Sequence, residues 1–199
     1  MKWIGLTGGI ACGKSTVSRM LRDRGYSLVD ADEVAREVVR AGTPGLKAVV
    51  KEFGEGVLLP DGSLDRRKLG SLVFGNPDRL HVLESITHPL IRKEIARRRQ
   101  NLEDMRTTLA IYDIPLLFET HAQENFDAII VVSCTKSQQK ERLMRRNQLT
   151  EAEIDMRIAS QIPIASKEAE ADFVLQNNRD EQHLLKEVER LDQWLKELK

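Results

Sequence analysis

The clearest chemistry in this chain lies near its start, where the segment Gly8 to Ser15 reads GGIACGKS and matches G-x-x-x-x-G-K-[ST] at every fixed position. Glycines let the backbone turn its N–H groups toward phosphate oxygens, and a following helix adds the positive end of its dipole. In such a motif Lys14 reaches the β- and γ-phosphates, Ser15 binds Mg²⁺ and Thr16 contacts the α-phosphate. The pattern predicts a P-loop for ATP, formed by Gly8, Gly9, Ala11, Cys12, Gly13, Lys14, Ser15 and Thr16.

Two aspartates follow the next apolar run of the chain, and they suit the transfer of a phosphoryl group. Alternation along an extended segment would place Asp30 and Asp32 on the same side. In this chemistry one carboxylate orients or deprotonates the attacking hydroxyl of the acceptor. We assign Asp32 as this base, while Asp30 serves either as a ligand to a Mg²⁺-bound water or as the N-cap of the next helix.

A third aspartate and two arginines complete the candidate catalytic set. Asp113 ends an apolar run in the manner of a Walker B strand, so it is expected to hold Mg²⁺, directly or through a water, together with Ser15. Arg142 and Arg146 lie four residues apart, share one helix face and offer planar donors to phosphate oxygens. Neutralising the charge that develops during transfer would make Arg142 catalytic.

The elements that must position these residues alternate between strand and helix patterns. This alternation predicts an α/β fold in which a parallel sheet is covered by helices on both faces. Ligands of such sheets bind beyond the carboxyl ends of the strands, where the residues named above lie. The expected strands are Trp3 to Thr7, Ser27 to Val29, Leu109 to Ile114, Ala128 to Ser133 and Phe173 to Leu175.

Two further segments interrupt this alternation. Residues 33–106 are mostly helical, and Gly-, Pro- and Asn-containing turns divide them into short helices. A parallel crossover needs only about a dozen residues, so this segment is expected to be an inserted lobe that binds the acceptor. Residues 137–166 are helical and rich in arginine, which suggests a lid. The chain 1–199 then forms a single domain whose core comprises residues 1–32, 107–136 and 167–199.

Composition limits the classes of function. Lys plus Arg and Asp plus Glu both number 31 among 199 residues, which argues against a nucleic-acid partner held by bulk positive charge. No window approaches the roughly 20 apolar residues that cross a bilayer, and no pattern of a signal peptide is present. We therefore expect a cytoplasmic enzyme with small-molecule partners and no membrane partner.

The two cysteines form no metal-ligand set. A thiol in an anion-binding loop at a helix N-terminus should have a lowered pKa and raised reactivity. We therefore hypothesise that Cys12 makes the protein sensitive to thiol oxidation, with Cys134 at a neighbouring strand end as a remote partner.

From Gly5 to about Asn178 the chain closely resembles the dephospho-CoA kinase family. Several motifs carry this resemblance in the family's order. They are Ile4 to Ile10 leading into the P-loop, Asp30-Ala31-Asp32 with Ala35-Arg36, Asp61-Gly62 through Asp65-Arg66, Ile86 to Pro89 with Ile91-Arg92, Asp113 to Glu119, Glu141 to Arg146, and Arg157-Ile158 with Gln161.

The resemblance implies transfer of phosphate from ATP to the ribose 3′-hydroxyl of dephospho-CoA, which completes coenzyme A synthesis. It implies that Asp32 is the base and that His88 and Arg92 lie near the acceptor, to which we also assign Asp113. Arg142 and Arg146 would lie near the ATP phosphates or adenine, and Asn178 would lie on the adenine side.

The same resemblance implies a nucleotide-kinase fold, a P-loop NTPase fold of three layers. It would have a five-stranded parallel core, a helical CoA-binding lobe and a mobile lid. We expect the protein to be a monomer or small homo-oligomer. The chain departs from the family at Ala11-Cys12, where small residues are usual, and at Asn178-Arg179, where glycine often follows the asparagine.

Two other functions fit parts of the pattern. A kinase for a nucleoside, nucleotide or sugar acid would keep the P-loop, Asp32 and the lid, but His88-Pro89 and the segment Asp113 to Glu119 argue against it. A P-loop switch or ATPase module that binds partners is the other alternative. A GTPase of that class would carry an N-K-x-D motif, and this sequence has none.

Overall fold

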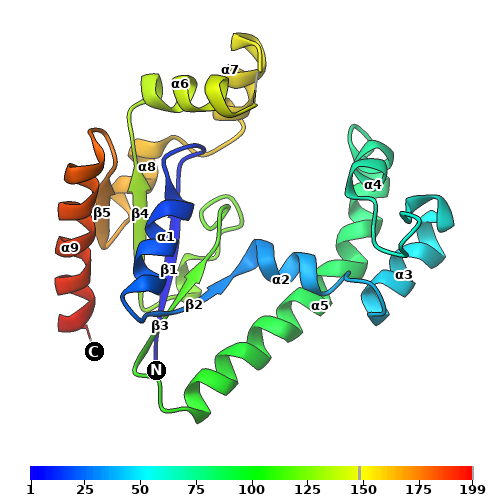
Figure 1. Ribbon diagram of the computed structural model, residues 1–199, viewed down its shortest axis with the longest axis horizontal. Coiled ribbons are helices and arrows are strands. Elements are labelled where there is room, and N and C mark those ends of the chain that lie inside the picture. Colours follow the sequence, from blue (N-terminus) through cyan, green and yellow to red (C-terminus); the bar gives the residue numbers. More distant parts are fainter. Residues whose placement is uncertain (148, 199) are drawn as a thin grey trace. The chain divides into compact units, whose positions relative to one another are not determined.

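The computed structural model describes residues 1–147 and 149–198 (Figure 1). A five-stranded sheet with the order β2-β3-β1-β4-β5 forms its centre, and β1 pairs in parallel with both β3 and β4, as β4 does with β5. The predicted parallel sheet is therefore confirmed. Its strands are β1 (Lys2–Gly8), β2 (Ser27–Asp30), β3 (Leu109–Asp113), β4 (Ala128–Ser133) and β5 (Phe173–Gln176).

Helices cover both faces of this sheet. Successive side chains of β4 point to opposite faces, so Ile130 and Val132 join one core while Ile129 and Val131 join another. The first core also takes apolar residues from α1 (Lys14–Asp23) and α9 (Glu181–Glu197). The second is closed by the segment after β3 and by α8 (Ile164–Ala169). Apolar burial on both faces explains why the central strands are continuous apolar runs.

The predicted lid region forms two helices before α8. These are α6 (Lys136–Asn147) and α7 (Glu151–Ala159), and Thr150 with Glu153 forms a capping box at the start of α7. Lys140 of α6 reaches Asp155 of α7, with 2.8 Å between Nζ and Oδ2. A short 3₁₀ helix, η2 (Gln123–Asn125), lies between β3 and β4.

Residues 30–101 form a separate compact unit. Its elements are α2 (Ala31–Glu37), α3 (Pro44–Phe53), the 3₁₀ helix η1 (Glu55–Val57), α4 (Arg66–Val73) and α5 (Pro77–Asp104) as far as Asn101. Val49 and Val57 are fully buried in its own apolar cluster. Thr43 and Asp65 accept hydrogen bonds from backbone N–H groups at the starts of α3 and α4. The predicted Gly- and Pro-containing turn around Thr43 therefore lies at a helix boundary.

One expectation about this unit is wrong. The sequence suggested only short helices, but α5 runs for 28 residues and contains Pro89 within it. Proline removes one backbone donor and crowds the preceding turn, which is why it usually ends a helix. Here the helix continues on both sides of His88-Pro89.

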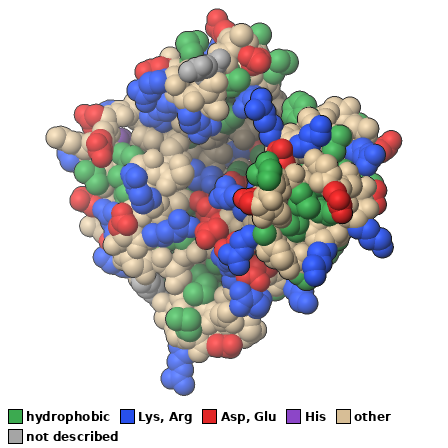
Figure 2. Space-filling view, turned by 45° about the vertical axis from the view of Figure 1, so that its right-hand side comes forward, with side chains coloured by type: hydrophobic (Ala, Val, Ile, Leu, Met, Phe, Trp, Pro, Cys, Tyr) green, Lys and Arg blue, Asp and Glu red, His purple; other side chains and the backbone are tan. Residues whose placement is uncertain are grey.

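Charged side chains of both signs are interspersed over the face seen in Figure 2, in keeping with the equal numbers of acidic and basic residues. No helix among residues 1–147 and 149–198 has the length and apolar character that would let it cross a membrane.

Candidate active site

The P-loop connects the end of β1 to the start of α1. Gly8 ends β1, and a Cβ there would lie 2.5 Å from the carbonyl oxygen of Val132 in β4. Gly13, at φ 94°, precedes α1 in the left-handed conformation, and a Cβ there would meet the side-chain amide of Asn177 at 2.3 Å. These two positions therefore require glycine, and they direct the N-terminal end of α1 toward the loop.

Lys14 is held by the end of the neighbouring strand. Its ammonium group donates a hydrogen bond to the carboxylate of Asp113, and the hydroxyl of Ser18 in α1 donates to the other oxygen of that carboxylate. Asp113 is 1% exposed, so its charge is balanced inside the protein by that of Lys14. The structure thus joins the two signature residues predicted for phosphate and metal binding. Ser18 was not predicted, because a serine one turn into a helix carries no local signal.

The outer side of the loop is fixed by α6 and by the end of β5. Asn177 donates from Nδ2 to the carbonyl oxygen of Cys12 at 2.9 Å. Arg142 donates to the carbonyl oxygens of Ala11 and Asn177, at 3.3 and 2.9 Å. Arg142 therefore lies against the P-loop, whereas Arg146 is exposed and bonds to the side chain of Asn147.

Two glutamines hold the tip of the loop. The backbone N–H of Ile10 donates to Oε1 of Gln161 at 2.8 Å, and Gln139 donates from Nε2 to the carbonyl oxygen of Ile10 at 2.9 Å. Gln139 lies in α6 and Gln161 in the connection between α7 and α8, so both ends of the predicted lid contact the P-loop. Gln139 was not among the predicted site residues.

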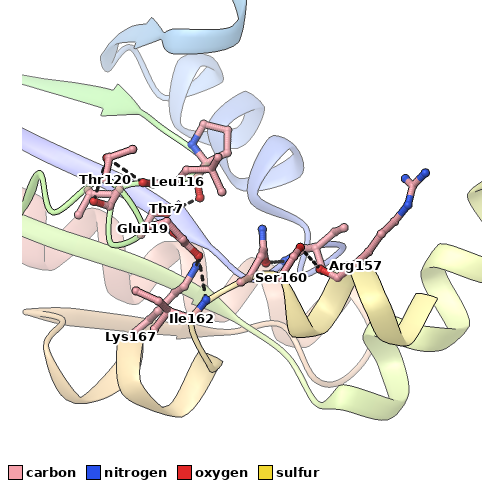
Figure 3. A network of polar contacts seen from close by, with 12 residues as sticks. Thr7, Leu116, Glu119, Thr120, Arg157, Ser160, Ile162 and Lys167 are labelled. Carbon is pink, nitrogen blue, oxygen red and sulfur yellow. Dashed lines mark hydrogen bonds and ion pairs between the residues drawn. The ribbon is translucent and has the colours of Figure 1, made fainter. Parts of the chain in front are cut away.

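A buried ion pair supports the Gln161 connection (Figure 3). Glu119 accepts hydrogen bonds on Oε1 from the backbone N–H of Ile162 at 3.1 Å and from the ammonium group of Lys167 at 2.6 Å. The side chain of Lys167 is fully buried, and the second oxygen of Glu119 is buried without a hydrogen-bond partner. The segment Asp113 to Glu119 therefore contacts the P-loop at its first residue and the connection between α7 and α8 at its last.

The expectation for the cysteines needs correction. Cys134 is not remote from Cys12, because their sulfur atoms lie 2.7 Å apart and both thiols are free and buried. The hydrogen bond with Cys134, together with burial, raises the pKa of Cys12 instead of lowering it. The same hydrogen bond, assisted by the positive charge of Arg142, lowers the pKa of Cys134. Desolvation and the neighbouring thiol therefore outweigh the effect of the helix N-terminus on Cys12.

The geometry argument for the aspartate pair is also wrong. Asp32 is the second residue of α2 and not part of an extended segment, so strand alternation does not relate it to Asp30. Asp30 accepts a hydrogen bond on Oδ1 from the backbone N–H of Glu33 at 3.0 Å and is the N-cap of α2. Of the two roles open to Asp30, the structure shows the cap. The side chain of Asp32 is exposed in the first turn.

The residues expected near the acceptor lie on α5. His88 and Arg92 are both exposed and stand four positions apart, hence on one face of this helix. A cavity of about 400 Å³ in the 30–101 unit is lined by other residues of α5, among them Leu90, Lys93 and Arg97. Neither His88 nor Arg92 lines that cavity.

Asn178 lies next to the residue that touches the loop. Its amide donates to the side chain of Gln176 at 3.4 Å, and its own oxygen is buried without a partner. The neighbouring Asn177 is the residue bonded to the P-loop.

Comparison with known proteins agrees with this arrangement. A model of the dephospho-CoA kinase family matches residues 2–183. The dephospho-CoA kinase of Bdellovibrio bacteriovorus is 68% identical over 199 residues, which are 100% of this chain and 98% of the relative. Among solved structures, TT1252 from Thermus thermophilus has a TM-score of 0.81 at 32% identity, covering 100% of this chain and 98% of that one. Dephospho-CoA kinase from Campylobacter jejuni has a TM-score of 0.74 at 30% identity, covering 97% and 96%.

Proposed function

The chain belongs to the dephospho-CoA kinase family, whose reaction is the final step of CoA biosynthesis, and we propose a role in this reaction for each candidate residue. ATP donates its γ-phosphoryl group to the ribose 3′-hydroxyl of dephospho-CoA. A bond forms between the acceptor oxygen and the γ-phosphorus, the bond to the bridging oxygen of ADP breaks, and the hydroxyl proton passes to the protein. The observation that carries this proposal is the P-loop whose Lys14 is paired with Asp113.

The P-loop binds and orients the phosphates. Backbone N–H groups between Gly8 and Thr16 donate to phosphate oxygens, and the ammonium group of Lys14 offsets the charge on the β- and γ-phosphates. Arg142 lies beside the loop through its bond to the Ala11 carbonyl oxygen, and we assign its guanidinium group to the charge that develops on the transferring phosphoryl group. Arg146 and Asn178 are assigned to the nucleotide as secondary contacts.

Asp32 accepts the proton of the attacking hydroxyl. Its carboxylate is exposed and is not the cap of α2, since Asp30 fills that position. Because the carboxylate of Asp32 does not serve as a helix cap, it is available to the hydroxyl group of a substrate. His88 and Arg92 bind the acceptor from one face of α5, where the positive guanidinium group attracts the anionic diphosphate of dephospho-CoA.

The residues at the P-loop fit Mg²⁺. Ser15 and Asp113 supply a hydroxyl and a carboxylate, and Mg²⁺ is bound by such oxygen ligands together with waters and substrate phosphates. A carboxylate has lone pairs beyond those that Lys14 and Ser18 occupy. When bound, the ion neutralises charge on the β- and γ-phosphates.

The direct test offers the purified protein several acceptors in parallel. With ATP and Mg²⁺ present, dephospho-CoA, adenosine, AMP and gluconate are incubated separately, and ADP is measured together with the product mass. We expect a gain of one phosphate on dephospho-CoA alone, in a product that is indistinguishable from coenzyme A. Transfer to another acceptor would overturn the assignment of the acceptor lobe, and ADP without a phosphorylated acceptor would indicate an ATPase.

A further inference from the structure

Two free thiols meet beneath the P-loop although 122 positions separate them in the sequence. Cys12 belongs to the loop itself, and Cys134 is the first residue after β4. The distance of 2.7 Å between their sulfur atoms is close to the length of a disulfide bond, which is about 2.0 Å. The geometry points to an oxidisable dithiol: Cys12 and Cys134 form an intramolecular disulfide on exposure to a hydroperoxide, and this bond reversibly slows phosphoryl transfer.

The two thiols have unequal roles in this reaction. Cys134 keeps 4% of its surface exposed and Cys12 keeps none, so a small oxidant reaches Cys134 first. The hydrogen bond with Cys12 and the positive charge of Arg142 lower the pKa of Cys134, while the pKa of Cys12 is raised. The reactive form of a cysteine is its thiolate. Cys134 is therefore the attacking residue and Cys12 the resolving one.

The reaction balances with a hydroperoxide as the only co-reactant. The thiolate of Cys134 attacks the terminal oxygen, a sulfur–oxygen bond forms, the oxygen–oxygen bond breaks, and the departing alkoxide or hydroxide takes up a proton. The sulfur of Cys12 then attacks the resulting sulfenic acid. A sulfur–sulfur bond forms, and hydroxide leaves with the proton of Cys12 as water. The two thiols lose two electrons in total, and the peroxide gains them.

The bond constrains the nucleotide site. Cys12 is already fixed on its backbone side, where Asn177 bonds to its carbonyl oxygen. The disulfide ties its side chain to Cys134 as well, so the loop backbone at Cys12 can no longer adjust when phosphates bind. Misplacing a positioned group by about 1 Å can cost about a hundredfold in rate. This consequence for activity rests on the proposed ATP-binding role of the P-loop, whereas disulfide formation does not.

The experiment exposes the wild-type protein to hydrogen peroxide under non-denaturing conditions and measures its intact mass, peptide map and kinase activity. We expect the loss of two hydrogen atoms, a crosslinked peptide pair containing Cys12 and Cys134, and a roughly tenfold or larger fall in turnover. Dithiothreitol should restore both the mass and the rate. Binding of a fluorescent ATP analogue is measured on the same samples. This measurement reports the effect of the disulfide on the P-loop even if dephospho-CoA is not the acceptor.

Cys134→Ala provides the matched control, because Cys134 contacts no proposed substrate. This variant should keep its basal turnover and retain it after peroxide treatment, since the remaining thiol of Cys12 is buried and has a raised pKa. The proposal is overturned if the treated wild-type protein acquires oxygen without a crosslink, or remains unmodified. It is equally overturned if the crosslinked protein binds nucleotide and turns over at the untreated rate.

Discussion

Lys14 of the P-loop donates a hydrogen bond to the buried carboxylate of Asp113, which stands 99 positions later at the end of the neighbouring strand β3. The hydroxyl of Ser18 donates to the same carboxylate. The register of β1 and β3 creates this contact, because it places Asp113 beside Leu6 and thus beside the last residues before the loop. One carboxylate therefore joins Lys14, the residue proposed to bind phosphate, to the proposed metal site.

Asp113→Asn should raise the Mg²⁺ concentration for half-maximal activity about tenfold, because the amide keeps the shape but removes the charge that attracts the cation. The measurement is ADP formation across a Mg²⁺ titration. Ser18→Ala is the control, since it deletes a donor to the same carboxylate and leaves its charge in place. Equal Mg²⁺ dependence in wild type and Asp113→Asn would remove Asp113 from the metal site. Chelation of Mg²⁺ should abolish turnover in all three proteins.

Asp32→Asn should lower kcat by about 10²–10⁴-fold while ATP binding stays near the wild-type value, as expected for the loss of a general base. Steady-state kinetics and nucleotide titration measure the two effects separately. Asp30→Asn is the matched control two residues away, because asparagine caps a helix as well as aspartate does. A comparable fall in kcat for Asp30→Asn, or a normal kcat for Asp32→Asn, would contradict the assigned roles.

Lys167→Met should destabilise the protein by about 3–5 kcal/mol, because it leaves the carboxylate of Glu119 buried without its cation. The double variant Glu119→Leu/Lys167→Met should recover much of this loss, since no charge is then left unpaired. Urea denaturation gives the free energies of unfolding.

The control for this pair is Lys140→Met, which breaks the more exposed ion pair with Asp155 and should cost no more than about 1 kcal/mol. If Lys140→Met and Lys167→Met lowered the free energy of unfolding by similar amounts, burial of the Glu119–Lys167 pair would not increase its contribution to stability.

The ionised carboxylate of Glu94 should stabilise the folded protein, and this contribution should be lost at acid pH. Hydrogen bonds from Arg97, and also from Arg98, lower its pKa from 4.5 to about 2. A carboxyl group with a depressed folded-state pKa contributes stability above its unfolded pKa, and this contribution is lost as the pH falls from 4.5 to about 2.

Glu94→Gln should therefore unfold more easily than wild type at pH 6, and the difference between the two proteins should shrink steadily below pH about 4.5. Urea titrations at several pH values measure this difference. If the difference in unfolding free energy between the two proteins stayed constant down to acid pH, Arg97 and Arg98 would not be the cause of a lowered pKa at Glu94.

Local patterns determined much of this protein from the sequence alone. Apolar runs of strand length located all five strands, and glycines at fixed spacing located the P-loop. Leu184, Val188 and Leu191 recur at helical spacing, and they lie on the face of α9 that packs on the core. Such features depend on residues close together in the sequence, since burial periodicity and backbone conformation are set within a few residues.

Tertiary structure decided which distant residues share a site and how each one is used. Asp32 belongs to a helix because Asp30 caps it, and the same aspartates in an extended segment would have had a different geometry. The contacts of Cys12 with Cys134 and of Glu119 with Lys167 join residues far apart in the chain. Strand order and sheet register bring these pairs together, and the hydrogen bond with Cys134, together with burial, reversed the expected pKa shift of Cys12. No local pattern encodes such pairings, because they arise only when the separate elements pack around one core.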